Sequence, residues 1–143
     1  MVVRLVLASV APGASIQPGR YVAGRDHPLR DPARRFLGRA RIGDVEICTS
    51  TEVLQEILYR YTALGRMDLA LSVYDLFVEI CPVVLPVTLA DTDRARLLLP
   101  ESTGLSVRDA LHAAVMLDNE VTEIASFDEG FDRIPGIRRL TLP

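Results

Sequence analysis

Two acidic residues in the last third of the chain stand where α/β proteins commonly build a site. Asp109 lies one turn into a helix rich in Ala and Leu, which Ser106 is expected to cap. Asp128 follows a short apolar run, Thr122–Ser126, that predicts a strand. In an open α/β sheet, ligands bind outside the carboxyl ends of the strands. A carboxylate on a buried helix also requires a partner, a metal ion or a changed protonation state, so both residues are candidates for binding or catalysis.

Each candidate acid also has a purely structural interpretation. Ser106 and Asp109 have the spacing of a capping box, so Asp109 could serve only the start of its helix. Asp128 opens an Asp-Glu-Gly sequence, which is typical of a turn. A third acid, Glu56, lies on an apolar helix four residues before Arg60, a spacing that suits an ordinary surface ion pair.

The elements that would position these acids alternate along the chain. Apolar runs predict strands at 2–10, 45–48, 83–86, 122–126 and 138–142. Helical patterns occupy 31 to about 42, 49–63 and 67–80, and two more helices start after Thr88 and Ser106. Three helix starts carry signals of their own: Asp31 before Pro32, a Thr49–Glu52 capping box, and Thr88 with Asp91. Buried strands that alternate with helices predict an α/β fold with a parallel sheet covered by helices.

Three motifs follow one another in the chain: V-L-Q-E-I at 53–57, L-S-x-x-D-A-L-H-A-A at 105–114, and S-F-D-x-x-F-D at 126–132. In this order and spacing they resemble the PIN-domain family, and within it the VapC-type toxin ribonucleases, over roughly Tyr21 to Leu140. The resemblance implies a PIN-like three-layer α/β fold, a central mostly parallel sheet flanked by helices, as a single domain over 1–143.

The resemblance also implies a function. VapC-type toxins cleave RNA phosphodiester bonds with four acids that bind Mg²⁺ or Mn²⁺, and they are held by an antitoxin protein. The motifs place three of those acids, Glu56, Asp109 and Asp128, as catalytic residues and metal ligands. A homodimer is expected on the same grounds.

Four further residues near these motifs have weaker roles. Asp132 is an auxiliary acid or a solvated loop residue, and Ser126 could hydrogen-bond Asp128 or a metal-bound water. His112 is expected to pack on a helix face, and Arg108 is either a surface charge or a phosphate contact.

The first family acid, which ends strand one, has no counterpart here. Aligning L-A-S-V at 7–10 places Leu7 at that position, and counting back from Tyr21 places Ser15 there instead. We therefore expect weak metal binding and slow cleavage. A non-catalytic module that binds RNA or an antitoxin is the alternative, and a shifted reading frame or wrong start for the atypical residues 1–20 is another.

Composition sets the remaining expectations. The chain of 143 residues is 49% hydrophobic and 24% charged, which fits one soluble domain whose apolar runs are too short to span a membrane. Cys48 and Cys81 lack metal-ligand spacing and are expected to be buried free thiols in the cytoplasm. Residues 1–41 hold eight Arg against two acids, a net charge of +6, and Arg30–Arg41 is a candidate RNA contact.

Overall fold

The computed structural model describes residues 5–7, 30–126 and 128–140, and it is built on a five-stranded parallel sheet. The strands are β1 (Leu5–Leu7), β2 (Ile47–Ser50), β3 (Val83–Leu85), β4 (Glu123–Ala125) and β5 (Arg138–Leu140), in the order β3-β2-β1-β4-β5. In the register, Val6 lies between Cys48 of β2 and Ile124 of β4, and Leu7 lies opposite Ala125. The predicted parallel sheet is confirmed.

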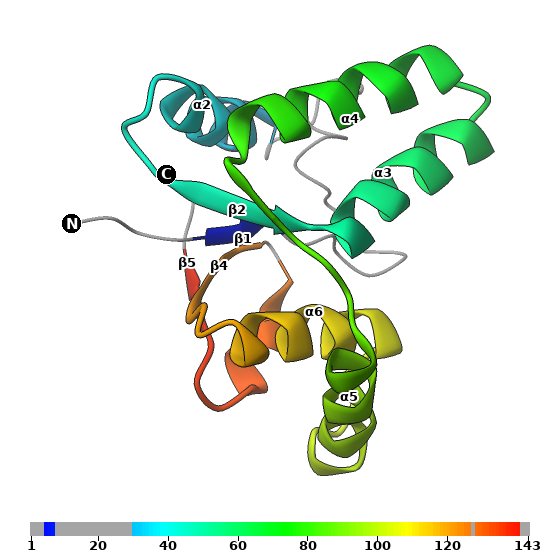
Figure 1. Cartoon of the computed structure of the whole chain (residues 1–143), viewed down its shortest axis with the longest axis vertical. Helices are drawn as coiled ribbons and strands as arrows, with labels where there is room; N and C mark the ends of the chain where they lie inside the picture. The colour runs from blue at the N-terminus through cyan, green and yellow to red at the C-terminus, as the bar shows by residue number, and fades with distance from the viewer. Residues whose placement is uncertain (1–4, 8–29, 127, 141–143) are drawn as a thin grey trace.

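Helices cover both faces of this sheet, so the fold has three layers (Figure 1). One face carries α2 (Arg30–Arg41), α3 (Thr51–Ala63) and α4 (Met67–Ile80), and the other carries α5 (Leu89–Glu101), α6 (Val107–Asp118) and the 3-10 helix η1 (Glu129–Arg133). Neighbouring strand residues point to opposite faces, so Ile47 joins the core under α3 and α4 while Cys48 joins the core under α6. Because both faces are buried, the strands show no polar alternation in the sequence.

The structure corrects three of the expected helix starts and strand ends. Strand β2 ends at Ser50, two residues later than expected, because Thr49 and Ser50 are themselves fully buried. Ser50 rather than Thr49 is the N-cap of α3, and its Oγ accepts a hydrogen bond from the Val53 amide at 3.3 Å. Helix α2 begins at Arg30, so Asp31 lies inside its first turn instead of capping it.

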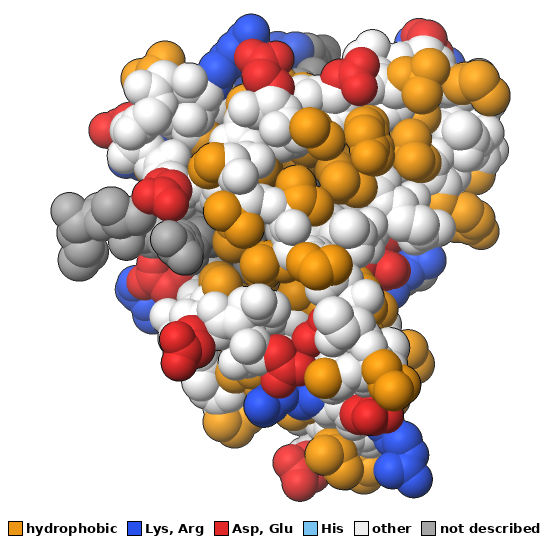
Figure 2. Space-filling view, in the orientation of Figure 1, with side chains coloured by type: hydrophobic (Ala, Val, Ile, Leu, Met, Phe, Trp, Pro, Cys, Tyr) orange, Lys and Arg blue, Asp and Glu red, His pale blue; other side chains and the backbone are white. Residues whose placement is uncertain are grey.

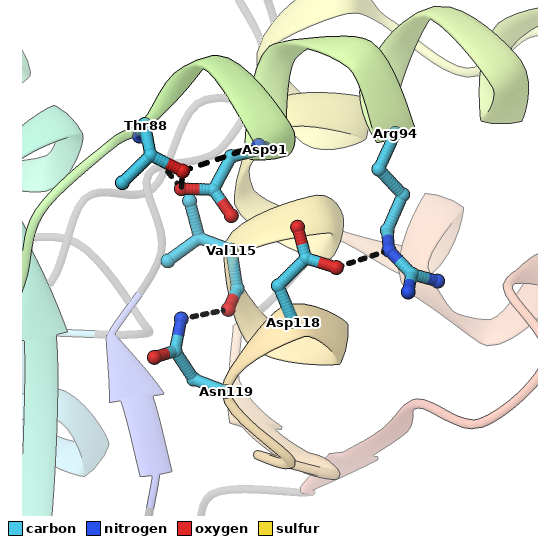
Figure 3. A network of polar contacts seen from close by, with 6 residues as sticks. All are labelled: Thr88, Asp91, Arg94, Val115, Asp118 and Asn119. Atoms are coloured by element: carbon cyan, nitrogen blue, oxygen red, sulfur yellow. Dashed lines mark hydrogen bonds and ion pairs between the residues drawn. The ribbon is translucent and has the colours of Figure 1, made fainter.

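Polar contacts cap the start of helix α5 and join its outer face to α6 (Figure 3). The expected capping box is present: the Thr88 amide donates to the buried Asp91 carboxylate at 2.7 Å, and Thr88 Oγ1 accepts from the Asp91 amide. Further along, Arg94 forms an ion pair with Asp118 on α6. These contacts stabilise the helix that carries Asp109.

The strand order reverses between β1 and β4, and this is where the fold can hold a ligand. The chain builds outward from β1 through β2 to β3, then returns to the other side of β1 as β4 and β5. Helices that leave adjacent strands in opposite directions open a crevice at the carboxyl end of the sheet. In this protein Leu7 ends β1 at that crevice, and the segment that carries Asp128 follows β4.

Candidate metal centre

Asp109 is the third residue of α6 and is almost completely buried, with 3% of its surface exposed. Ser106 caps the helix, as the sequence predicts, and its Oγ accepts a hydrogen bond from the Asp109 amide at 3.0 Å. The cap therefore uses the backbone amide of Asp109. Within the described residues, Oδ1 of that buried carboxylate has no hydrogen-bond partner.

Asp128 is held in place by residues on both sides of it in the chain. The Ser126 hydroxyl, buried just after β4, accepts a hydrogen bond from the Asp128 amide at 3.1 Å, which confirms the expected contact between the two. The Asp128 carboxylate is the N-cap of η1, where its Oδ1 accepts from the Gly130 amide at 2.8 Å. The turn role and a ligand role are therefore compatible, because a carboxylate accepts several hydrogen bonds.

The carboxylates of Asp109 and Asp128 lie beside each other at the crevice. A methyl group built on Gly130 would stand 3.0 Å from Asp128 Oδ1 and 3.7 Å from Asp109 Oδ2, so both carboxylates border the same point. The pKa of Asp109 is raised to about 6, chiefly by burial and next by the negative charge of Asp128. Two close carboxylates in a desolvated setting are what a bound cation stabilises.

Glu56 lies on α3, and its described partners lie across the crevice on α6. It is buried, with 1% exposed, and its Oε1 is 3.2 Å from Arg108 Nε and 3.5 Å from His112 Nε2. The spacing of Arg108 and His112 is the sequence signal for this contact, because residues four apart share one helix face.

Two other acids were assigned differently by sequence and structure. Glu52 was expected to complete a capping box, but it lies partly buried in the first turn of α3, where burial raises its pKa and His112 opposes that rise. Asp132, the auxiliary candidate, forms a two-point ion pair with Arg139 at 3.0 and 2.9 Å, which lowers its pKa. Asp132 is therefore occupied in stabilising η1 against β5.

The structure thus brings two of the three predicted acids directly together. Asp109 and Asp128 are adjacent, whereas Glu56 is turned toward Arg108 and His112. In the described ranges no three His, Cys, Asp or Glu side chains form a group compact enough to hold a metal ion. The residues nevertheless fit a hard cation, because the donors are carboxylate oxygens and Asp109 presents a buried oxygen without a hydrogen bond. The assignment of all three as ligands stays a prediction.

Gly130 is expected to control the spacing of the two aspartates. In Gly130→Ala, the new methyl group would press on Asp128 Oδ1 from 3.0 Å, so this carboxylate must shift. We expect Mn²⁺ affinity to fall by about threefold to tenfold, since displacing a ligand loosens a preorganised site. Titration of Mn²⁺ followed by electron paramagnetic resonance measures this. Gly38→Ala is the matched control, because a methyl group there meets nothing within 4 Å; equal affinities in the two variants would contradict the prediction.

Comparison with known proteins gives a consistent result. The family model of the PIN domain matches residues 20–137. Ribonuclease VapC13 of Mycobacterium tuberculosis is 42% identical over 84% of this chain and 92% of its own length, and Ribonuclease VapC23 of the same species is 41% identical over 76% and 85%. The crystal structure of VapC20 from M. tuberculosis, a toxin described as cleaving the sarcin-ricin loop, superposes with a TM-score of 0.64 over 87% of this chain and 89% of that one, at 18% identity.

The match covers all three motif acids and β4, and it leaves β1 outside the part that the family model recognises. The superposition supports the three-layer fold, and the sequence identity supports a place among the VapC ribonucleases. The chain therefore belongs to the PIN-domain family and, within it, to the VapC-type toxin ribonucleases.

Proposed function

We propose that this protein is the toxin of a toxin–antitoxin pair and cleaves RNA phosphodiester bonds with Mg²⁺ or Mn²⁺ at the crevice between β1 and β4. One observation carries this proposal: the buried Asp109 and the partly buried Asp128 are adjacent at the switch point of the sheet, in a chain that is 42% identical to a VapC ribonuclease. Structural capping alone does not account for a buried carboxylate oxygen without a hydrogen bond.

The proposed roles follow from the positions of the side chains. Asp109 and Asp128 would hold the ion, and Glu56 would add a third carboxylate from the opposite helix layer. The Ser126 hydroxyl orients Asp128 through its backbone, and Ser106 does the same for Asp109. When bound, the divalent ion would lower the pKa of a water nucleophile and stabilise charge on the phosphate.

A second function, binding without cleavage, is favoured by one observation. Residue 7, at the end of β1, is Leu, and the backbone register places it at the carboxyl end of the strand next to β4. This is where the family pattern has its first acid. A PIN domain without that acid could bind RNA or an antitoxin and cut slowly or not at all.

The proposed partners are an antitoxin protein, RNA and a second copy of this chain. Large apolar side chains are exposed on α3, α4 and the turn between them: Tyr59, Leu64, Met67, Leu71 and Val78. Figure 2 shows hydrophobic side chains gathered over this part of the molecule, which supports a protein partner there.

RNA is proposed to approach the arginines of α2. Arg34 and Arg35 are exposed, while Arg39 and Arg41 pair with Asp44 and Glu79 at the end of the helix. Their contact with RNA stays a prediction.

The cellular location is also a proposal. In the described part of the chain, no helix has the length and apolar character that crossing a bilayer requires. Cys48 and Cys81 are buried free thiols, as expected, and support a reducing compartment such as the cytoplasm.

Cleavage of a mixed single-stranded RNA tests the proposed function directly. The protein is incubated with RNA and Mg²⁺, Mn²⁺ or EDTA, and the products are separated on a denaturing gel. We expect cuts that depend on the divalent ion and that disappear in EDTA. Products of equal intensity with EDTA would exclude a metal-dependent nuclease. Metal-dependent binding of RNA without products would favour the second function.

A further inference from the structure

The ion pair between Arg108 and Glu56 joins a half-exposed cation to a buried anion. Glu56 is 1% exposed at its side chain, whereas the Arg108 side chain is 35% exposed. Among the described residues, Glu56 is the acid with which Arg108 forms an ion pair. Only Nε of the guanidinium approaches Glu56 Oε1, at 3.2 Å, and a guanidinium carries five N–H donors. Arg108 can therefore meet a second anion that arrives from solvent.

The pair also occupies an oxygen that Glu56 could offer to a metal ion in the proposed function. The oxygen that Arg108 contacts, Glu56 Oε1, is one of the two oxygens with which Glu56 could ligate a cation. His112 Nε2 is 3.5 Å from the same oxygen, so two nitrogen atoms from α6 lie near Oε1. When Glu56 turns to a divalent ion, the guanidinium loses its partner and lies close to added positive charge. It then needs a new anion.

We propose that Arg108 is a positioning residue that changes partners: it neutralises Glu56 in the metal-free protein and binds a phosphate of the RNA backbone when Glu56 ligates the metal. This inference rests on the proposed function. The inference adds to that function the residue that couples metal binding to RNA binding. Arg108 is suited to this exchange because its planar fork of donors matches carboxylate and phosphate alike.

The exchange predicts opposite effects of one substitution on two ligands. In Arg108→Gln, Mn²⁺ no longer competes with a guanidinium for Glu56, so Mn²⁺ should bind about threefold to tenfold more tightly. With Mn²⁺ present, the same variant should bind RNA more weakly, and the dependence of affinity on salt should lose a slope of about 1. In EDTA, where Arg108 remains on Glu56, the RNA salt slopes of the variant and the unmodified protein should agree. A residue that only stabilises the fold would not move the two affinities in opposite directions.

The experiment uses the full chain and two ligands. Free Mn²⁺ is quantified by electron paramagnetic resonance, and a short fluorescein-labelled single-stranded RNA is titrated at several salt concentrations, with a gel verifying that it is intact. Arg96→Gln, on the exposed side of α5, is the charge-matched control and should change neither affinity by more than about twofold. Arg108→Lys keeps the charge without the fork, so its Mn²⁺ affinity should stay near that of the unmodified protein.

Three results would overturn the proposal in distinguishable ways. If both variants bind Mn²⁺ and Arg108→Gln binds it no more tightly than Arg96→Gln, the proposed change of partners is wrong. The proposed metal site is not contradicted by that result. If Mn²⁺ affinity rises but the RNA salt slope is unchanged, Arg108 does not meet phosphate. If the unmodified protein and Arg108→Gln both bind no Mn²⁺, the proposed metal-dependent function fails, and the exchange fails with it.

Discussion

Replacing Leu7 with Asp is expected to raise metal-dependent RNA cleavage by a factor on the order of 10²–10³, because it returns a carboxylate that acts on charge in the transition state. Leu7 ends β1, between the carboxyl ends of β2 and β4, and lies opposite Ala125, three residues before Asp128. Parallel strands that end together bring their following residues to one edge of the sheet. A carboxylate at position 7 is therefore expected to join Asp109 and Asp128. Initial rates of cleavage of one RNA at saturating Mn²⁺ measure the gain.

The controls separate the new charge from its position. Leu7→Asn has nearly the same shape as Leu7→Asp without the charge, so it should give no comparable gain. Ser15, the other position that the sequence offered, lies outside the described residues, and the rate of Ser15→Asp is compared with that of Leu7→Asp. Thermal unfolding with and without Mn²⁺ accompanies the rates, since binding stabilises only a folded site. If the unmodified protein already cleaves as fast as Leu7→Asp, another group supplies the missing ligand, and our account of an impaired site is wrong.

Asp109→Asn is expected to have opposite effects on activity and on stability. In the Leu7→Asp background, it should remove metal-dependent cleavage by a factor on the order of 10²–10³, since one ligand charge is lost. In the metal-free protein at pH 7, the same change should stabilise the fold by about 1–2 kcal/mol, because an uncharged amide escapes the burial and repulsion that act on Asp109. For a chain of this size, that corresponds to a rise of about 3–6 °C in Tm.

The pH dependence of stability gives a second measurement of the same effect. In the folded, metal-free protein the pKa of Asp109 is raised from its ordinary 3.8 to about 6. The folded state therefore holds the proton more tightly than the unfolded state, so this contribution to stability is fully present below pH 4 and is lost as pH rises through 6. We expect the Tm of Asp109→Asn minus that of the unmodified protein to grow between pH 4 and pH 7 without metal. Saturating Mn²⁺ at pH 7 should reverse the sign of the difference, and a difference that stays constant with pH would refute this assignment.

The fold class and most of the helix boundaries could be predicted from the amino-acid sequence, which also carries the three motif acids as a pattern. Apolar strands alternating with helices predicted the parallel sheet, and the capping residues Thr88 and Ser106 were correct. These features depend on local chemistry, such as a hydroxyl that accepts from an amide three residues on, and local chemistry can be read along the chain. The boundary between β2 and α3 was misplaced because burial of Thr49 and Ser50 depends on the layers above and below them.

The positions of the acids relative to one another depend on how the helices and strands pack. A surface pair between Glu56 and Arg60 was the structural alternative that the sequence allowed, and the fold also brings Arg108 and His112 of α6 close to Glu56 from more than fifty residues away in the chain. It likewise made neighbours of Asp109 and Asp128, and the burial of Asp109, followed by the charge of Asp128, raises the pKa of Asp109. Charge interactions depend on distance through space and on local solvent, and neither is encoded in the spacing of residues along the chain.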